Sequence, residues 1–156
     1  MEPVTYENLT IRAYEHGSAD DKKGYILRHD VLALVAGVSD KTLEFIYGSH
    51  DDEADQTKLG AFVDDGMVAT LCLVPHGNGE AMIKQFAVST KLQGQGVGRK
   101  LLEYAHAVAK EMGYTRIVLD ARMNAAGFYA KCGYIFTGKR RAYTLVTLDE
   151  MYIDLV

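Results

Sequence analysis

A glycine-rich segment between two regular elements constrains the fold of this chain more than any other feature. Glycines stand at alternate positions within 94–98, after a strand-like run at 80–88. The apolar residues of 97–112 then recur at helical spacing, which places them on one face of an α-helix. A β-branched run at 115–121 follows. Strand, loop, helix and strand predict a right-handed crossover between parallel strands.

The remaining elements predict a mixed sheet. Asp65-Gly66 is typical of a hairpin turn, because glycine readily adopts the positive φ that tight turns need. A second turn is expected at 76–79, so an antiparallel meander precedes the crossover. We expect an α/β (α+β) fold with a twisted central sheet of about six or seven strands and about four helices. The expected strands are 9–14, 59–64, 67–74, 80–88, 115–121, 133–138 and 142–155, and the expected helices include 23–37, 96–112 and 125–131.

Size and composition indicate one domain over residues 1–156. The chain is 48% hydrophobic and 24% charged, which suffices for a core. Its net charge of −4 disfavours nucleic acid as a partner. Cys72 and Cys132 are too few for a disulfide framework. No run approaches the roughly 20 apolar residues of a membrane helix, and no leader peptide is visible. We therefore expect a cytoplasmic protein that does not contact a membrane.

The glycine segment "QGQGVG" suggests a phosphate-binding loop. The first amides of a helix lack internal partners and carry partial positive charge, and glycines let a phosphate approach them closely. The segment is not a Walker loop, because Arg99 and Lys100 stand where Lys and a hydroxyl residue would be needed. A dinucleotide-binding loop stays open, since Asp120 ends the next strand, although the glycine spacing differs. A turn without any ligand is the other alternative.

Two motifs together resemble the GNAT family of N-acetyltransferases. The family loop has the form Gln/Arg-x-x-Gly-x-Gly/Ala, and residues 93–98 supply it. The preceding triplet Phe86-Ala87-Val88 is similar to the family's Leu-Ala-Val. Downstream, Asn124, Phe128-Tyr129 and Gly133-Tyr134 stand in the family's order and spacing. The resemblance covers residues 80–138 strongly, and residues 1–79 only in the order of expected elements.

The resemblance implies a site for acetyl-coenzyme A. The amides of Gln95 to Arg99 would hold the pyrophosphate, and the backbone of 86–88 would pair with the pantetheine arm in a gap between strands 80–88 and 115–121. Asn124 would hydrogen-bond this arm, and Phe128 would pack near the cofactor. The implied cofactor-binding residues are Phe86, Ala87, Val88, Gln93, Gly94, Gln95, Gly96, Val97, Gly98, Arg99, Asn124, Phe128 and Tyr129.

The chemistry implied is acetyl transfer to a primary amine by direct attack in a ternary complex. The Val88 amide would polarise the thioester carbonyl, and Tyr129 would protonate the leaving thiolate as general acid. A base is harder to find. Some family members carry a glutamate in the strand before the loop, where this chain has Met82. Glu80 could act through a water, or it could be a solvated turn residue. A non-catalytic acetyl-coenzyme A sensor is therefore the alternative function.

The acceptor and the assembly are less constrained. The acidic segment 49–58 is expected to be a surface loop, which hints at a cationic amine, either a small molecule or a peptide. The five histidines lack metal-ligand spacing, so no metal is expected. The basic run 139–141 is expected at a solvated edge or near the 3′-phosphate of coenzyme A. The apolar segment 144–156 could be an edge strand that pairs with a second copy, so a homodimer is possible.

Overall fold

The computed structural model describes residues 1–33, 53–142 and 146–156. Its strands are β1 (Val4–Tyr6), β2 (Leu9–Tyr14), β3 (Thr57–Val63), β4 (Gly66–Gly77), β5 (Glu80–Val88), β6 (Arg116–Arg122), β7 (Ile135–Ala142) and β8 (Thr147–Asp154). Its helices are α1 (Ala19–Arg28), α4 (Val97–Glu111) and α5 (Met123–Lys131), with a π-helical turn η1 (His29–Ala33) after α1.

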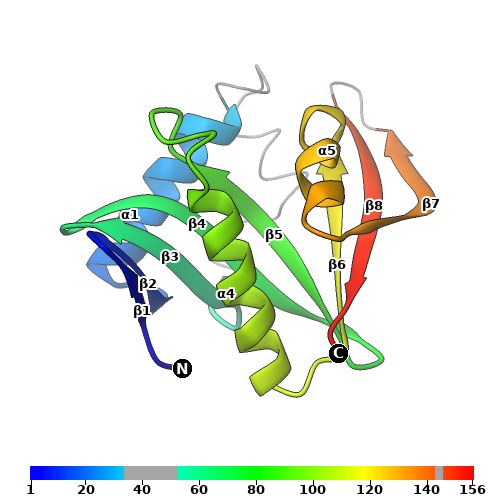
Figure 1. Ribbon diagram of the computed structural model, residues 1–156, viewed down its shortest axis with the longest axis horizontal. Coiled ribbons are helices and arrows are strands. Elements are labelled where there is room, and N and C mark those ends of the chain that lie inside the picture. Colours follow the sequence, from blue (N-terminus) through cyan, green and yellow to red (C-terminus); the bar gives the residue numbers. More distant parts are fainter. Residues whose placement is uncertain (34–52, 143–145) are drawn as a thin grey trace.

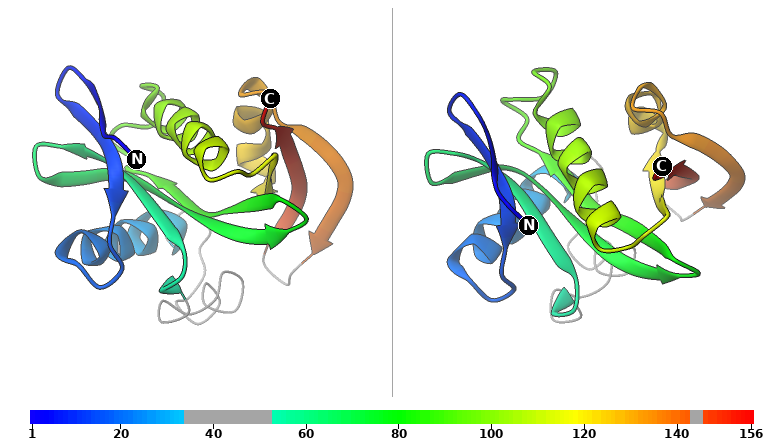
Figure 2. Two further views of the ribbon diagram at one scale, coloured as in Figure 1. Left: turned by 90° about the horizontal axis from the view of Figure 1, so that it is seen from below. Right: turned by 60° about the horizontal axis from the view of Figure 1, so that its bottom comes forward.

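All eight strands form one sheet in the order β1-β2-β3-β4-β5-β6-β8-β7. Every neighbouring pair is antiparallel except β5 and β6, which α4 connects as a parallel crossover. Helix α1 lies on one face of the sheet, and α4 and α5 lie on the other (Figures 1 and 2). The predicted mixed α+β architecture and its crossover are confirmed.

The parallel pair is short, and its two strands then separate. β5 and β6 are paired only over Glu80–Ile83 and Arg116–Leu119. Beyond Ile83, β5 turns away from β6, and Figure 1 shows α5 next to the resulting gap. The separation required by the predicted cofactor site is therefore present.

Local sequence explains the ends of the helices. Ser18 caps α1, because its hydroxyl accepts a hydrogen bond from the Asp21 amide at 3.2 Å. Gly113 follows α4 with φ +93°, the left-handed conformation that glycine adopts without strain. The predicted apolar face of α4 is buried against the sheet, apart from Met112, which is exposed at the end of the helix.

Several sequence expectations were wrong in detail. The sheet has eight strands, because the short, exposed segment Val4–Tyr6 pairs with β2. The first hairpin turn places Asp64, and not Gly66, at positive φ. Ile26 is exposed, so it does not share the buried face expected for the first helix. Residues 34–37, which complete that expected helix, lie outside the described residues.

Two expectations about surface segments also fail. Within 49–58, Glu53 and Lys58 are buried, and Lys58 already belongs to β3, while 49–52 lie outside the described residues. The final strand β8 is not an edge, because it lies between β6 and β7. Its interior position explains why Leu148 and Met151 are buried. The homodimer stays a prediction, but β8 does not offer the edge that was expected to form it.

Candidate active site

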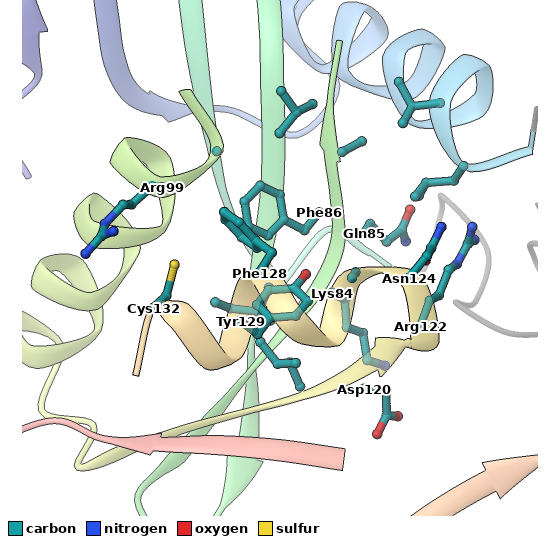
Figure 3. A pocket seen from close by; sticks show the side chains of 18 of the residues that line it. Lys84, Gln85, Phe86, Arg99, Asp120, Arg122, Asn124, Phe128, Tyr129 and Cys132 are labelled. Carbon is teal, nitrogen blue, oxygen red and sulfur yellow. The ribbon is translucent and has the colours of Figure 1, made fainter. Parts of the chain in front are cut away.

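A cavity of about 770 Å³ opens where β5 and β6 separate. Its lining comes from β5, the glycine loop, the start of α4, the end of β6 and one side of α5 (Figure 3). These segments are far apart in sequence, and the crossover brings them together. The carboxyl ends of the two parallel strands therefore form the mouth of the site, which is where open α/β sheets place ligands.

The glycine loop leaves space for a ligand at one end of the cavity. Gly94 and Gly96 have φ near +84°, and a Cβ at either position would meet nothing within 4 Å. The loop is tied to the end of β5, because the Gln93 side chain donates a hydrogen bond to the Val88 carbonyl at 3.0 Å. The two glycines therefore allow the positive φ that the loop needs, and their lack of side chains keeps the outer surface of the loop open.

The amino end of α4 is suited to an anion. Gly96 is its N-cap and supplies no side-chain hydrogen bond, and its first turn contains no acidic residue. Instead, Arg99 and Lys100 stand in that first turn, which the helix dipole disfavours unless a negative charge is bound there. Uncapped amides and Arg99, which lines the cavity, make this end of α4 suited to a phosphate. The Lys100 ammonium instead lies 5.3 Å from the centre of the Tyr6 ring.

Gly98 has a different role from the two loop glycines. It lies inside α4, and a Cβ there would be 3.2 Å from Val88 Cγ2 and 3.6 Å from the rings of Phe86 and Phe128. Glycine therefore allows the first turn of α4 to lie close to β5. This contact places the anion-binding amides directly beside the open edge of β5.

Three aromatic rings line the middle of the cavity. The ring of Tyr129 lies 6.1 Å from that of Phe86 and 5.3 Å from that of Phe128, both edge to face. Tyr129 is 9% exposed, and Figure 3 shows it projecting from α5 beside β5. A phenol hydroxyl held at this depth is positioned for proton transfer to a group that enters along β5.

Most of the predicted site residues meet in this cavity, and three do not line it. Gln95 and Val97 are not among the lining residues, although they belong to the loop and the start of α4. Glu80 lies at the far end of β5, paired with Arg116, and also does not line the cavity. The predicted residues that line it are Phe86, Ala87, Val88, Gln93, Gly94, Gly96, Gly98, Arg99, Asn124, Phe128 and Tyr129.

Sequence reasoning missed a charged cluster at the other end of the cavity. Lys84 and Asp120 follow the last β5–β6 pair and extend side by side in Figure 3. Arg141 of β7 contacts the Asp120 carboxylate and bonds Glu150 at 3.1 Å. Burial raises the pKa of Asp120, although Arg141 opposes this shift. Opposite charges in β6, β7 and β8 were visible in the sequence, but their pairing depends on the strand order.

Cations outnumber carboxylates around the cavity. Among the described lining residues, Asp120 is the only carboxylate, against five cations: Lys84, Arg99, Arg122, Lys131 and Arg141. Glu53, in the segment expected to attract a cationic acceptor, is instead buried and ion-paired with Arg28 and Lys58. Of the two described acidic residues in this segment, only Asp55 is exposed, which weakens the hint of a cationic acceptor.

The cysteines and metal-binding groups give no separate site. Cys72 is buried, and burial raises the pKa of its thiol to about 11. Cys132 lines the cavity, and burial also raises the pKa of its thiol, so neither is an activated nucleophile. Across 1–33, 53–142 and 146–156, no cluster of His, Cys, Asp and Glu could hold a metal ion, and no helix could span a membrane.

Comparison with known proteins agrees with this geometry. A streptothricin acetyltransferase of Escherichia coli is 34% identical over 59% of this chain, and the chain spans only 55% of that relative. A glucosamine 6-phosphate N-acetyltransferase of Arabidopsis thaliana is 26% identical over 81% of this chain and 90% of its own length. The crystal structure of a Lactobacillus plantarum protein assigned as an N-acetyltransferase shares the fold, with a TM-score of 0.84, 23% identity and coverage of 96% and 100%.

The described sheet has a single parallel pair, so it is not the doubly wound sheet of a dinucleotide-binding domain. The acetyltransferase (GNAT) family matches residues 13–134, which include the meander, the glycine loop, α4 and α5. The chain therefore belongs to the GNAT family of acetyltransferases, enzymes that use acetyl-coenzyme A.

Proposed function

We propose that this chain transfers the acetyl group of acetyl-coenzyme A to the primary amine of a small molecule. One observation supports this most directly: the gap between β5 and β6 joins an anion-binding helix end to a buried tyrosine. Acetyl-coenzyme A matches this arrangement, because its pyrophosphate would lie at the helix end and its thioester near the tyrosine. The predicted amides from Gln95 to Arg99 would hold the pyrophosphate.

The open edge of β5 would align the acetyl donor. Beyond Ile83, β5 has no partner on its β6 side, so alternate backbone groups of 86–88 face the cavity. In this proposal they pair with the pantetheine arm, Asn124 hydrogen-bonds the same arm, and Phe128 packs against it. The Val88 amide donates a hydrogen bond to the thioester carbonyl, which stabilises negative charge that develops on its oxygen.

Tyr129 serves as the general acid in this reaction. The amine nitrogen attacks the carbonyl carbon, the carbon–sulfur bond breaks, and the leaving thiolate takes the phenol proton of Tyr129. The attacking ammonium has first lost a proton to water. Glu80 lies outside the cavity and β5 carries no other carboxylate, so ordered water is the proposed route for that proton. Bulk solvent then restores the phenol proton.

We further propose that the acceptor carries an anionic group several bonds from its amine. Lys84 projects beside Asp120 where the strands separate, and its charge acts on that carboxyl. It lies four residues before Val88 on the same strand. A phosphate or carboxylate could bind Lys84 while the amine meets the thioester. The relative that acts on glucosamine 6-phosphate supports this chemistry.

A titration with acetyl-coenzyme A, followed by thiol release against amines, tests the function. Glucosamine and glucosamine 6-phosphate form a matched pair of acceptors that differ only in the phosphate. Binding with thiol release supports the enzyme, and a higher kcat/KM for the phosphorylated acceptor supports the anionic group. Binding without release on any amine favours the alternative, a sensor of acetyl-coenzyme A, which the lack of a β5 carboxylate in the cavity also favours. No binding would refute both.

A further inference from the structure

The strand that lines the cavity contains a strained residue. Gln85 of β5 has φ +57°, although it is not a glycine. A long side chain rarely adopts this left-handed conformation, and it persists only where the surroundings hold it. Pairing with β4 shifts at the same place, from Lys84 opposite Cys72 to Ala87 opposite Thr70. Gln85 therefore lies at a β-bulge.

The bulge decides where the cavity-facing backbone lies. It follows the last β5–β6 pair, at Ile83, by two residues and precedes the segment Phe86–Val88. A bulge bends its strand and increases its twist. The position of Phe86–Val88 relative to α5 therefore depends on the conformation of Gln85.

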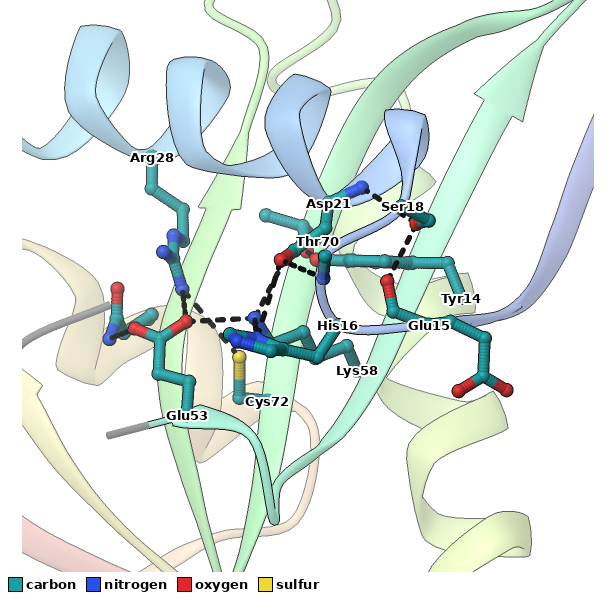
Figure 4. A network of polar contacts seen from close by, with 12 residues as sticks. Tyr14, Glu15, His16, Ser18, Asp21, Arg28, Glu53, Lys58, Thr70 and Cys72 are labelled. Carbon is teal, nitrogen blue, oxygen red and sulfur yellow. Dashed lines mark hydrogen bonds and ion pairs between the residues drawn. The ribbon is translucent and has the colours of Figure 1, made fainter. Parts of the chain in front are cut away.

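A buried hydrogen bond holds Gln85 in place. Its Nε2 donates to Oε2 of Glu53 at 2.7 Å, and both residues are buried. Oε1 of the same carboxylate accepts from Arg28 Nη1 at 2.9 Å and lies 3.0 Å from Lys58 Nζ (Figure 4). One carboxylate thus joins the bulge to α1 and β3.

The carboxylate itself cannot move freely. Lys58 is fully buried and also binds Asp21 of α1 at 2.7 Å, so two cations and two carboxylates balance one another. Burial would raise the pKa of Glu53, but Arg28 and Lys58 outweigh burial and lower it. Glu53 therefore stays ionised at neutral pH and offers Gln85 a fixed acceptor.

We propose that Glu53 is a positioning residue for acetyl transfer. Through its hydrogen bond, it keeps Gln85 in the left-handed conformation, and this conformation aims the backbone of Phe86–Val88 at the thioester. Neither side chain takes part in the chemistry. The inference rests on the proposed function, because the backbone it positions is the one proposed to bind the acetyl donor.

Two substitutions at one position test this inference. Gln85→Met and Gln85→Gly both remove the hydrogen bond to Glu53, but glycine adopts positive φ without strain and methionine does not. We expect kcat to fall about 10- to 100-fold in the methionine variant, since small misplacements carry penalties of this size. The kcat of the glycine variant is expected to stay within about fivefold of the wild-type value. A glycine variant as impaired as the methionine variant would overturn the proposal.

Further variants separate positioning from stability. Gln85→Asn tolerates the left-handed region but is too short to replace the bond, so it should behave like the glycine variant even if Gln85→Met fails to fold. Tyr134→Phe removes a hydrogen bond with His106, outside the network around Glu53, and should lower the melting temperature without changing kcat below it. A fall in kcat for Tyr134→Phe equal to that of Gln85→Met would assign the effect to general destabilisation.

A readout without substrate keeps this inference separate from the proposed function. Amide hydrogen exchange of residues 86–88 in the free protein should be faster in Gln85→Met than in wild type, and unchanged in Gln85→Gly. Equal exchange in all three proteins would refute the positioning role. Failure of the wild-type protein to bind acetyl-coenzyme A would refute the function and leave the exchange result valid.

Discussion

Tyr129 shows how much one hydroxyl group is expected to contribute. We predict that Tyr129→Phe lowers kcat by about 10²- to 10⁴-fold, the usual contribution of a general acid. Acetyl-coenzyme A affinity should stay within about threefold, because the ring and its contacts with Phe86 and Phe128 are retained. Thiol release and calorimetric titration measure the two quantities separately.

Tyr134 provides a matched control for this prediction. Its ring lies 5.7 Å from that of Tyr129, and its hydroxyl is 2.7 Å from Nε2 of His106. Burial raises the pKa of Tyr134, so this phenol stays protonated. Tyr134→Phe should cost about 1 kcal/mol of stability, the net value of one hydrogen bond, and leave kcat unchanged. A comparable loss of kcat in both variants would remove Tyr129 from its proposed role.

Lys58 illustrates a residue whose importance is structural. Its ammonium lies between Asp21 and Glu53 and has no solvent exposure. We predict that Lys58→Met lowers the free energy of unfolding by about 3–5 kcal/mol, because it leaves buried carboxylates with too little positive charge. Urea denaturation at pH 7 measures this loss. The exposed pair of Arg99 and Glu103 is a control, and Arg99→Met should change stability by less than about 1 kcal/mol.

Single residues were predictable where a local rule fixed them. The spacing of Gly94 and Gly96 predicted the loop, and the Phe128-Tyr129 pair was recognised from its distance in sequence after that loop. Arg141 and Glu53 were not, because each contacts a residue on a distant segment: Arg141 contacts Asp120, 21 residues away, and Glu53 contacts Arg28, 25 residues away. Lys84 was not, because its place in the cavity depends on where β5 and β6 separate. Side-chain pairs across a sheet depend on strand order, which local patterns do not contain.

At the level of elements, α4 packs closely against β5 at Gly98, where a side chain would meet Val88. We predict that Gly98→Ala weakens acetyl-coenzyme A binding about tenfold. Its new Cβ would stand 3.2 Å from Val88 Cγ2, so the first turn of α4 must shift away from β5. Calorimetric titration with acetyl-coenzyme A measures the change in affinity.

Gly127 of α5 is the control for that substitution. A Cβ there meets nothing within 4 Å, and its φ is not positive. Gly127→Ala should therefore leave affinity unchanged and raise stability by up to about 1 kcal/mol, since alanine favours the helix. Equal affinity in the two alanine variants would contradict the packing explanation.

The elements were largely predictable because each carries its own signal. The face of α4, the turns that bound β5 and the β-branched residues of β6 are local patterns, and their ranges agree with the structure within two residues. β1 was missed because it has only three residues, too few to show a strand pattern. The bulge at Gln85 was missed because a hydrogen bond that Gln85 donates to Glu53, 32 residues away, stabilises it.

At the scale of the whole molecule, the buried charges make stability depend on pH. The folded chain holds Glu53 with a pKa below the ordinary 4.5, so below that pH the unfolded chain binds the proton first. Glu53 therefore stabilises the fold above pH 4.5, and this stability disappears as the pH falls towards the lowered pKa. We predict that melting temperatures decline between pH 5 and pH 3 in wild type and decline less steeply in Glu53→Gln. Parallel slopes would assign the acid sensitivity to other carboxylates.

The order of strands also has a consequence for how the chain folds. β1 to β5 pair in the order in which they occur, so their contacts are local and can form early. In the other half, β7 precedes β8 in the chain, yet β8 lies between β6 and β7. β7 therefore cannot pair with the sheet until β8 has been synthesised. A nascent chain would first complete the meander and the crossover helix, and Arg141 and Leu148 would join the cavity lining only after residues 147–154 have been added.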